Sequence, residues 1–296
     1  MTTRRQFMAG AAATLGAAAF APRAALAQSA ATLGDLFARE ANRRERIARI
    51  GLQLYTVRAE MQKDVAATLA RAAQIGYREV EFAGYFRLSP EQLRELIDQN
   101  GLTSPSVHTS IESLERDFAA SAAAARVIGH EMLIVPSLNT RTLTNTAAWQ
   151  GIAARFNALG RKARDAGLRF GFHNHAAEAT AMADGATPYD ILLGDTDPAL
   201  VDFQMDLYWM IKAGGEPLAY FTSHPGRFRS VHVKDATPAP ELAMRDVGAG
   251  SIDWKKIFGQ HAQAGIQHYM VEHDSPGADP FASAKASHDY LANLEF

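Results

Sequence analysis

The chain has 296 residues, of which 47% are hydrophobic and 21% are charged, a composition typical of a globular protein with a sizeable core. Its formal net charge of −2 excludes a strongly basic surface, so neither nucleic acid nor an anionic membrane is an expected partner. There is no cysteine, which excludes disulfides, thiolate metal sites and cysteine nucleophiles.

The N-terminal stretch is predicted to be an export signal rather than part of the fold. Arg4 and Arg5 precede an apolar run at 9–20, and residues 25–27 supply a small-x-small cleavage pattern. The apolar run of about 12 residues is shorter than the ~20 needed to span a bilayer, which disfavours a stable membrane anchor. The paired arginines resemble the twin-arginine export signal. We therefore expect residues 1–27 to be removed, the twin-arginine translocation machinery to be a partner, and the mature protein to be periplasmic or secreted.

Residues 28–49 are charged and helix-prone, and we expect them to form a lead-in helix or a semi-ordered segment. After them, short apolar runs alternate with longer amphipathic stretches. Such runs are typical of parallel strands buried on both faces, with crossover helices between them. The predicted strands are Ile50–Tyr55, Glu79–Ala83, Ser104–His108, Met132–Pro136, Leu168–His173, Leu200–Asp206, Ser230–Lys234 and His268–Glu272.

The stretches between these runs predict helices, and several of them end at a glycine, where a positive φ is favoured. Eight strand–helix units in about 245 residues match the size of a closed (β/α)₈ TIM barrel. A doubly wound open sheet is the alternative, but no Gly-x-Gly-x-x-Gly turn follows the first predicted strand. We expect one catalytic domain over residues 50–296. The predicted helices include Val65–Ile75, Pro90–Gln99, Leu114–Ile128 and Thr146–Ala166.

Imidazole and carboxylate side chains end the later predicted strands. In barrels of this kind the active site lies at the C-terminal ends of the strands. One such residue alone is more often a helix cap or a backbone partner, but four strand ends in a row favour a metal, because buried charge is costly unless it is paired or metal-bound. A mixed nitrogen and oxygen set without thiolate suits Mn²⁺ or Zn²⁺, with Co²⁺, Fe²⁺ and Mg²⁺ also open, better than Ca²⁺. We therefore expect one divalent metal ion.

Several motifs, taken in their order and spacing, resemble the sugar phosphate isomerase/epimerase family. This family belongs to the xylose isomerase-like barrels, which also include ketose 3-epimerases, inosose dehydratases and endonuclease IV. The resemblance covers essentially the whole chain after the signal. The motifs are Gly51-Leu52-Gln53-Leu54-Tyr55-Thr56-Val57-Arg58, Gly171-Phe172-His173-Asn174-His175, Met205-Asp206-Leu207-Tyr208-Trp209, His232-Val233-Lys234-Asp235, Val247-Gly248-Ala249-Gly250-Ser251-Ile252-Asp253-Trp254 and Val271-Glu272-His273-Asp274.

The resemblance implies that His173, Asp206, His232 and Glu272 hold the metal. His173 departs from the family pattern, because the ketose epimerases have a glutamate at the end of strand five. In those epimerases the carboxylates of strands five and eight form the acid/base pair. The departure puts a symmetric two-carboxylate mechanism in doubt and leaves Glu272, Glu178 and His175 as candidate bases.

Weaker candidates are expected to contact the substrate or to support the site. They share a place at or just after a predicted strand end, and each also has an ordinary structural interpretation. His108 and Glu81 end earlier strands, Lys234 and Asp235 follow His232, Trp209 offers an apolar wall, and Arg245 lies in the loop after strand seven.

The expected activity is that of a metal-dependent sugar isomerase or epimerase, which removes a proton next to a carbonyl and passes through an enediolate. One alternative is a lyase or dehydratase acting on a 3-keto-glycoside or an inosose, which needs one base rather than two matched carboxylates. A non-catalytic exported sugar-binding barrel is a second alternative. Neutral sugars are preferred to sugar phosphates because no glycine-rich phosphate loop is present. The sequence leaves open whether the chain forms a homo-oligomer.

Overall fold

The computed structural model describes residues 44–296. The predicted export signal and most of the predicted lead-in segment lie outside the described residues. Residues 44–49, the described part of that segment, form neither helix nor strand. None of the helices described is long and apolar enough to cross a membrane.

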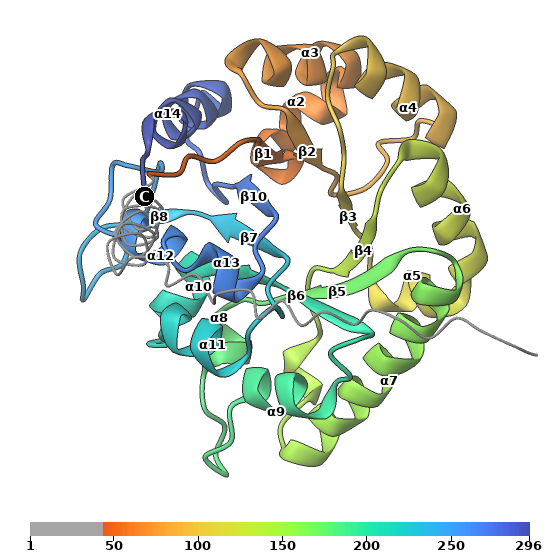
Figure 1. Cartoon of the computed structure of the whole chain (residues 1–296). Helices are drawn as coiled ribbons and strands as arrows, with labels where there is room; N and C mark the ends of the chain where they lie inside the picture. Colours follow the sequence, from red (N-terminus) through yellow and green to blue (C-terminus); the bar gives the residue numbers. More distant parts are fainter. Residues whose placement is uncertain (1–43) are drawn as a thin grey trace, which may run out of the picture. The chain divides into compact units, whose positions relative to one another are not determined.

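Within the described residues, eight parallel strands form a barrel (Figure 1). Their order is β2-β1-β10-β7-β6-β5-β4-β3, and β2 meets β3 through the isolated pairs Glu79 with Thr103 and Phe82 with Val107. This arrangement confirms the predicted (β/α)₈ fold. The strands are β1 Ile50–Gln53, β2 Glu79–Glu81, β3 Ser106–His108, β4 Met132–Val135, β5 Arg169–His173, β6 Val201–Asp206, β7 Ser230–Val233 and β10 His268–Val271.

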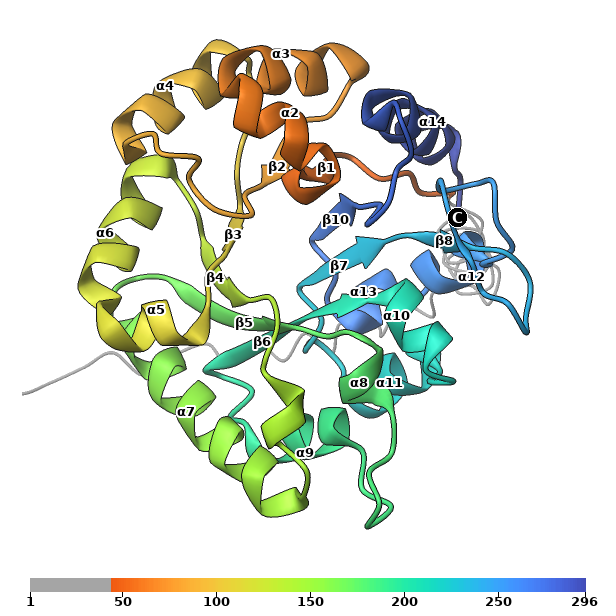
Figure 2. The same ribbon diagram turned by 180° about the vertical axis from the view of Figure 1, so that it is seen from behind.

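Helices surround the barrel on its outside, as both views show (Figures 1 and 2). The predicted helices at 65–75 and 90–99 have the expected bounds. The helices are α2 Arg58–Lys63, α3 Val65–Ile75, α4 Pro90–Gln99, α5 Ile111–Arg116, α6 Phe118–Ile128, α7 Thr146–Asp165, α8 Ala176–Ala179, α9 Pro188–Asp195, α10 Leu207–Lys212, α11 Pro217–Ser223, α12 Trp254–Phe258, α13 His261–Ala264 and α14 Pro280–Asn293, with short 3₁₀ turns η1 Leu54–Val57 and η2 Thr140–Thr142.

The single helix predicted over 114–128 is wrong, because the chain forms two helices there. Asp117 separates α5 from α6 with a backbone φ of −151°, which is not helical. Its side chain accepts a hydrogen bond from the backbone N–H of Ala120, three residues later. An aspartate that caps a new helix in this way ends the preceding one.

The apolar core lies between the barrel wall and the surrounding helices, and β2 shows how the strands divide it from the interior. Val80 and Phe82 belong to the core. Glu81, between them, contacts polar side chains of β1, β6 and β7 inside the barrel. Alternate residues of a strand face opposite sides, so the interior at this level is polar while the outer layer is apolar.

Helix α7 packs closely on the start of β6. A Cβ atom placed on Gly160 would lie 2.5 Å from the carbonyl oxygen of Leu200. Only a residue without a side chain allows the helix and the strand to approach this closely.

Candidate active site

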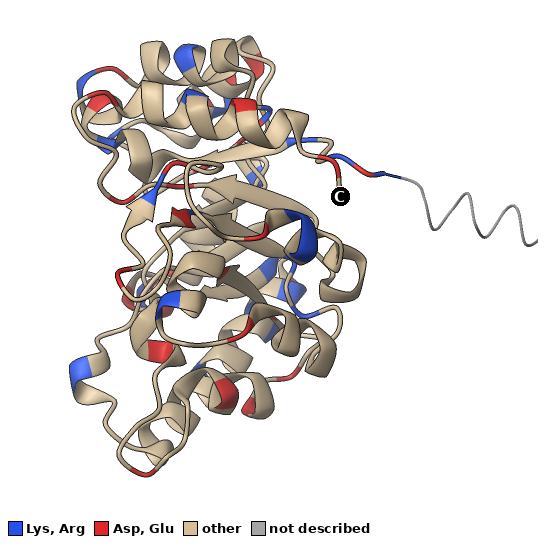
Figure 3. Cartoon of the chain, turned by 90° about the vertical axis from the view of Figure 1, so that its left-hand side faces the viewer, with Lys and Arg blue, Asp and Glu red and all other residues tan. Residues whose placement is uncertain are grey.

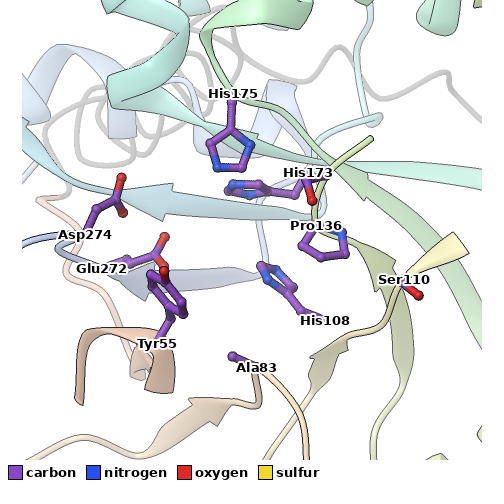
Figure 4. A pocket seen from close by; sticks show the side chains of 10 residues that line it. Tyr55, Ala83, His108, Ser110, Pro136, His173, His175, Glu272 and Asp274 are labelled. Carbon is purple, nitrogen blue, oxygen red and sulfur yellow. The ribbon is translucent and has the colours of Figure 1, made fainter. Parts of the chain in front are cut away.

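A pocket of about 540 Å³ opens at the C-terminal ends of the strands. In Figure 4 the carboxylates of Glu272 and Asp274 lie on one side of this pocket, and the imidazoles of His173, His175 and His108 lie across from them. The pocket is therefore bounded by acids on one wall and by histidines on the other. Its lining residues are Tyr55, Ala83, His108, Ser110, Pro136, Ser137, His173, His175, Glu272 and Asp274.

The structure brings the four expected metal ligands together. His173, Asp206 and His232 lie on β5, β6 and β7, and Glu272 directly follows β10. One ligand atom from each lies within 4.8 Å of the others, and all four residues are buried. Parallel strands that end at the same rim of the barrel place these side chains at one point.

The donor set fits a divalent cation. Nδ1 of His173 is buried and makes no hydrogen bond. Oδ2 of Asp206 lies 3.7 Å from the other ring nitrogen of His173 and has the Lys234 ammonium 2.9 Å away. A buried polar atom without a partner is costly, and a cation held among these imidazoles and carboxylates would give the His173 ring a partner. Two imidazoles and two carboxylates without thiolate form a set that could hold Zn²⁺, Mn²⁺ or a similar ion.

Lys234 places a fixed positive charge beside this set. Its Nζ lies 2.9 Å from Asp206 Oδ2, 2.6 Å from Glu272 Oε2 and 2.7 Å from Asp274 Oδ1. Burial alone would lower the pKa of Lys234, but the three carboxylates raise it above its ordinary value. Burial alone would raise the pKa of Glu272, but Lys234 and His232 hold it well below its ordinary value. Lys234 and Glu272 are therefore both charged at neutral pH.

The imidazole of His232 lies between two carboxylates. Its Nδ1 is 2.8 Å from Glu272 Oε2, and its Nε2 is 2.7 Å from Glu81 Oε1. Carboxylates accept hydrogen bonds, so both ring nitrogens donate in this arrangement. Burial would lower the pKa of His232, but Glu272 and Glu81 raise it to about 10.

Of the three candidate bases, His175 and Glu272 line the pocket. Burial lowers the pKa of His175, so its imidazole is neutral near pH 7. Glu178 is buried outside the pocket lining, where its carboxylate accepts a hydrogen bond of 2.9 Å from the backbone N–H of His175. The structure therefore places Glu178 behind His175, as the residue that holds its backbone.

Among the expected substrate contacts, His108 lines the pocket, whereas the others lie behind or beside it. Glu81 is fully buried beneath it. The ring of Trp209 lies 5.9 Å from that of His175 without lining the cavity. Arg245 is exposed on β9 (Met244–Arg245), which pairs with β8 (Asp235–Ala236).

Asp235 organises the loop after β7. Its carboxylate accepts hydrogen bonds from the backbone N–H groups of Gly248 and Ile252 and from the indole N–H of Trp254, at 2.8, 3.1 and 3.0 Å. A Cβ on Gly250 would lie 2.2 Å from the same carboxylate. These contacts occupy Asp235 with the protein's own loop.

Sequence reasoning missed several side chains of the site. Asp274 lines the pocket and binds Lys234, and its place two residues after Glu272 was the available signal. Tyr55 also lines the pocket and is 43% exposed, although it ends the first predicted strand. Gln204 bridges His108 and Glu81 at 2.8 and 2.7 Å. It lies two residues before Asp206 on β6, so strand alternation could have placed it on the same inward side.

The pocket walls carry histidines but no permanently charged cation, because there is no lysine or arginine among the described lining residues. Figure 3 shows acidic and basic positions interspersed over the elements visible in that view. A phosphate at these walls would face the carboxylates of Glu272 and Asp274 without a lysine or arginine beside it on the described walls.

Comparison with known proteins gives one family and several relatives. A family model described as "Xylose isomerase-like TIM barrel" matches residues 69–294. An inosose dehydratase of Clostridium beijerinckii is 22% identical over 262 residues, which cover 75% of this chain and 87% of that protein.

Solved structures with similar folds support the same assignment. A sugar phosphate isomerase/epimerase from Parabacteroides distasonis has a TM-score of 0.71 and 28% identity, covering 83% of this chain and 98% of that one. The IOLI protein, solved with a bound zinc atom, has a TM-score of 0.66 and 12% identity, covering 81% of this chain and 95% of that one. At that identity the second likeness concerns the fold alone.

Proposed function

Because the chain belongs to the xylose isomerase-like TIM barrel family, we propose that it is a sugar-modifying enzyme and that its reaction is an elimination on a keto-sugar. The reaction begins with removal of a proton from the carbon next to the carbonyl. Isomerases and epimerases of this kind begin with the same step, so the proposal differs from the isomerase expectation only in the second half of the reaction.

One observation carries the choice: the groups on the two walls of the pocket are not equivalent. Glu272 is bound to Lys234 at 2.6 Å and to His232 at 2.8 Å, and these cations keep its pKa low. A carboxylate held in this way is a weak base. Across the pocket, the burial-lowered pKa of His175 keeps its imidazole neutral and able to accept a proton. One base and no matched partner suits an elimination better than a two-base epimerisation.

The proposed steps need a single proton carrier. His175 takes the proton from the carbon next to the carbonyl, and the electron pair released there forms a carbon–carbon double bond. The C–O bond one carbon further along breaks. The imidazolium formed at His175 then gives its proton to the departing oxygen, which leaves as water or as an alcohol.

The metal set supports the first step. A divalent cation held by His173, Asp206, His232 and Glu272, with Zn²⁺ or Mn²⁺ favoured, would stabilise the negative charge that develops on the carbonyl oxygen. Imidazole and carboxylate ligands in this number make Zn²⁺ the first ion to test.

The substrate is proposed to be an uncharged keto-sugar, a keto-glycoside or a cyclic polyol ketone. The absence of lysine and arginine from the described pocket walls disfavours a phosphate group. Tyr55, exposed at the pocket, offers an aromatic face of the kind that packs on the apolar face of a sugar ring. Relatives named inosose dehydratase make an inosose the first substrate to test.

Isomerase or epimerase activity is the second candidate. The solved relative at 28% identity, which is named a sugar phosphate isomerase/epimerase, favours it, and the same pocket groups would carry the shared first step. A sugar-binding barrel without catalysis is the third candidate. It would need neither a neutral imidazole such as His175 at the pocket nor a buried set of four potential metal ligands beside it.

Product mass separates the three candidates. Protein loaded with Zn²⁺ or Mn²⁺ would be incubated separately with an inosose, a free ketose and a 3-keto-glycoside. Mass spectrometry would then measure the masses of the products. We expect a product that has lost water or the alcohol of the glycoside. Products of unchanged mass would refute the elimination and favour an isomerase, and binding without turnover would favour the third candidate.

His175→Asn should lower kcat by about 10²–10⁴-fold, the usual contribution of a general base. Glu178→Gln is the matched control, because its amide oxygen can still accept the backbone N–H of His175, and it should keep most of the activity. Loss of activity in the control with retention in His175→Asn would assign the base to Glu178 instead.

A further inference from the structure

We propose that Glu81 is a positioning residue, which from the barrel interior holds the His232 imidazole in the orientation that presents Nδ1 to the metal set. The inference rests on the proposed function only in taking His232 as a ligand. It assigns Glu81 a different role from the substrate contact expected from the sequence.

Glu81 has no access to substrate. Its side chain is 0% exposed, and it does not line the pocket. Its partners converge inside the barrel, and one of them, His108, also lines the pocket, with its Nε2 3.1 Å from Oε1. Oε1 accepts from Gln53 Nε2 at 2.6 Å and from His232 Nε2 at 2.7 Å, while Oε2 accepts from Gln204 Nε2 at 2.7 Å and from the Ser106 hydroxyl.

These partners fill the hydrogen-bonding positions of the Glu81 carboxylate and also hold it in one orientation. Ser106, Gln53 and Gln204 come from three different strands, so no single side-chain rotation releases Glu81. Gln53 is itself oriented, because its amide oxygen accepts the backbone N–H of Tyr55 at 3.1 Å. Gln204 also donates to the Ser230 hydroxyl at 2.9 Å. A carboxylate fixed on several sides can in turn fix the ring that donates to it.

The bond to Glu81 decides which nitrogen of His232 is available to a metal. Nε2 donates to Glu81 Oε1, and Nδ1 points to Glu272 Oε2, a member of the metal set. When one ring nitrogen donates to a carboxylate, the tautomer and the ring orientation are set and the other nitrogen becomes the more basic ligand. Nδ1 is therefore the ligand atom that this arrangement prepares.

The same strand supplies a matched control. Glu79, two residues earlier on β2, accepts from Nδ1 of His268 at 2.9 Å, and both side chains are buried. This pair lies where β2 and β10 begin, at the end of the barrel away from the metal set. It reproduces the glutamate–histidine contact without the neighbouring ligands.

Metal binding tests the role without reference to catalysis. Purified wild-type protein, Glu81→Gln and Glu79→Gln would be titrated with Zn²⁺ against a competing chelator and with Co²⁺ followed by visible absorption. If the amide oxygen of a glutamine at 81 keeps the bond to His232 Nε2, its NH₂ group faces the NH₂ group of Gln204. The network must then rearrange, which weakens the support of His232. We expect Glu81→Gln to weaken metal binding about 10–100-fold and to alter the Co²⁺ spectrum, while Glu79→Gln changes neither.

Ser106→Ala provides a second, milder variant in case Glu81→Gln does not fold. It removes one donor to Glu81 and should weaken metal binding by less than Glu81→Gln while shifting the Co²⁺ spectrum in the same direction. Wild-type metal affinity and an unchanged spectrum in Glu81→Gln, or in Ser106→Ala if that is the variant that folds, would overturn the positioning role while leaving the proposed function intact. A wild-type protein that binds neither ion would overturn both.

Discussion

Replacing Lys234 by methionine tests whether a cation is required among the buried carboxylates. Methionine keeps an unbranched chain and removes the charge. Each contact of Lys234 with Asp206, Glu272 and Asp274, at 2.6 to 2.9 Å, carries about 6 kcal/mol of gross Coulomb attraction at an effective dielectric constant of about 20. Desolvation offsets most of this. Removing one partner of a buried pair costs about 3–5 kcal/mol, and we expect a loss of that size in the metal-free variant.

A divalent cation should reverse much of that loss. Binding to the folded state alone stabilises a protein by about 4 kcal/mol when the free metal is 1,000 times its dissociation constant. In Lys234→Met the metal no longer shares Asp206 and Glu272 with an ammonium group. The free energy of unfolding should therefore rise more on metal addition in the variant than in the wild type.

Urea unfolding with a chelator, and again with excess Zn²⁺, measures both effects. Lys285→Met is the control: Lys285 forms an exposed ion pair with Asp289, so its loss should change the free energy of unfolding by under about 1 kcal/mol. The reasoning is refuted if Lys234→Met is as stable as the wild type in chelator. It is also refuted if Zn²⁺ stabilises the two proteins equally.

Two further predictions concern the scaffold. Burial lowers the pKa of His130 to about 4, so between about pH 6.5 and 4 the unfolded chain binds a proton that the folded one does not, and stability falls as the pH falls. His130→Asn should reduce this slope by up to about 1.4 kcal/mol per pH unit in unfolding measurements across that range, and an unchanged slope would contradict it. Gly160→Ala should lower the free energy of unfolding by about 1–3 kcal/mol, because it forces a Cβ against Leu200. Gly151→Ala, in open space on the same helix, should raise it by about 0.5–1 kcal/mol. Thermal melts measure both, and equal changes in melting temperature would contradict this pair of predictions.

The fold could be predicted from the sequence because each strand carries its own signal. The run at 132–135 is apolar throughout, since its residues are buried on both faces of the barrel wall. The start of a helix could be predicted where a capping residue was recognisable in the sequence. Ser89 is an example, and its hydroxyl accepts a hydrogen bond from the backbone N–H of Gln92. The break at Asp117 was missed because a capping aspartate inside an amphipathic stretch looks the same as a surface residue until the backbone is seen.

The site could be predicted only in part. Strand ends were enough to expect imidazoles and carboxylates near one another, because parallel strands finish at one rim. The choice of His173, Asp206, His232 and Glu272 as the ligand set came from the family resemblance. The partners of each group were not predictable. That the Lys234 ammonium lies among carboxylates from three segments depends on the closure of the barrel, and no local pattern in the sequence records that distance.

The polar interior has a mechanical consequence for the barrel. The strands β2 and β3 meet through isolated pairs, with backbone hydrogen bonds such as Val80 N–H to the Thr103 carbonyl and His108 N–H to the Phe82 carbonyl on either side of Glu81. Glu81 of β2 is bonded to Ser106 of β3 and across the interior to Gln204 of β6. These side-chain hydrogen bonds add to the backbone hydrogen bonds that join β2 to the rest of the barrel. The same bonds therefore hold both β2 and the carboxylate of Glu81 in place. Local separation of β2 from β3 would also release the ring of His232.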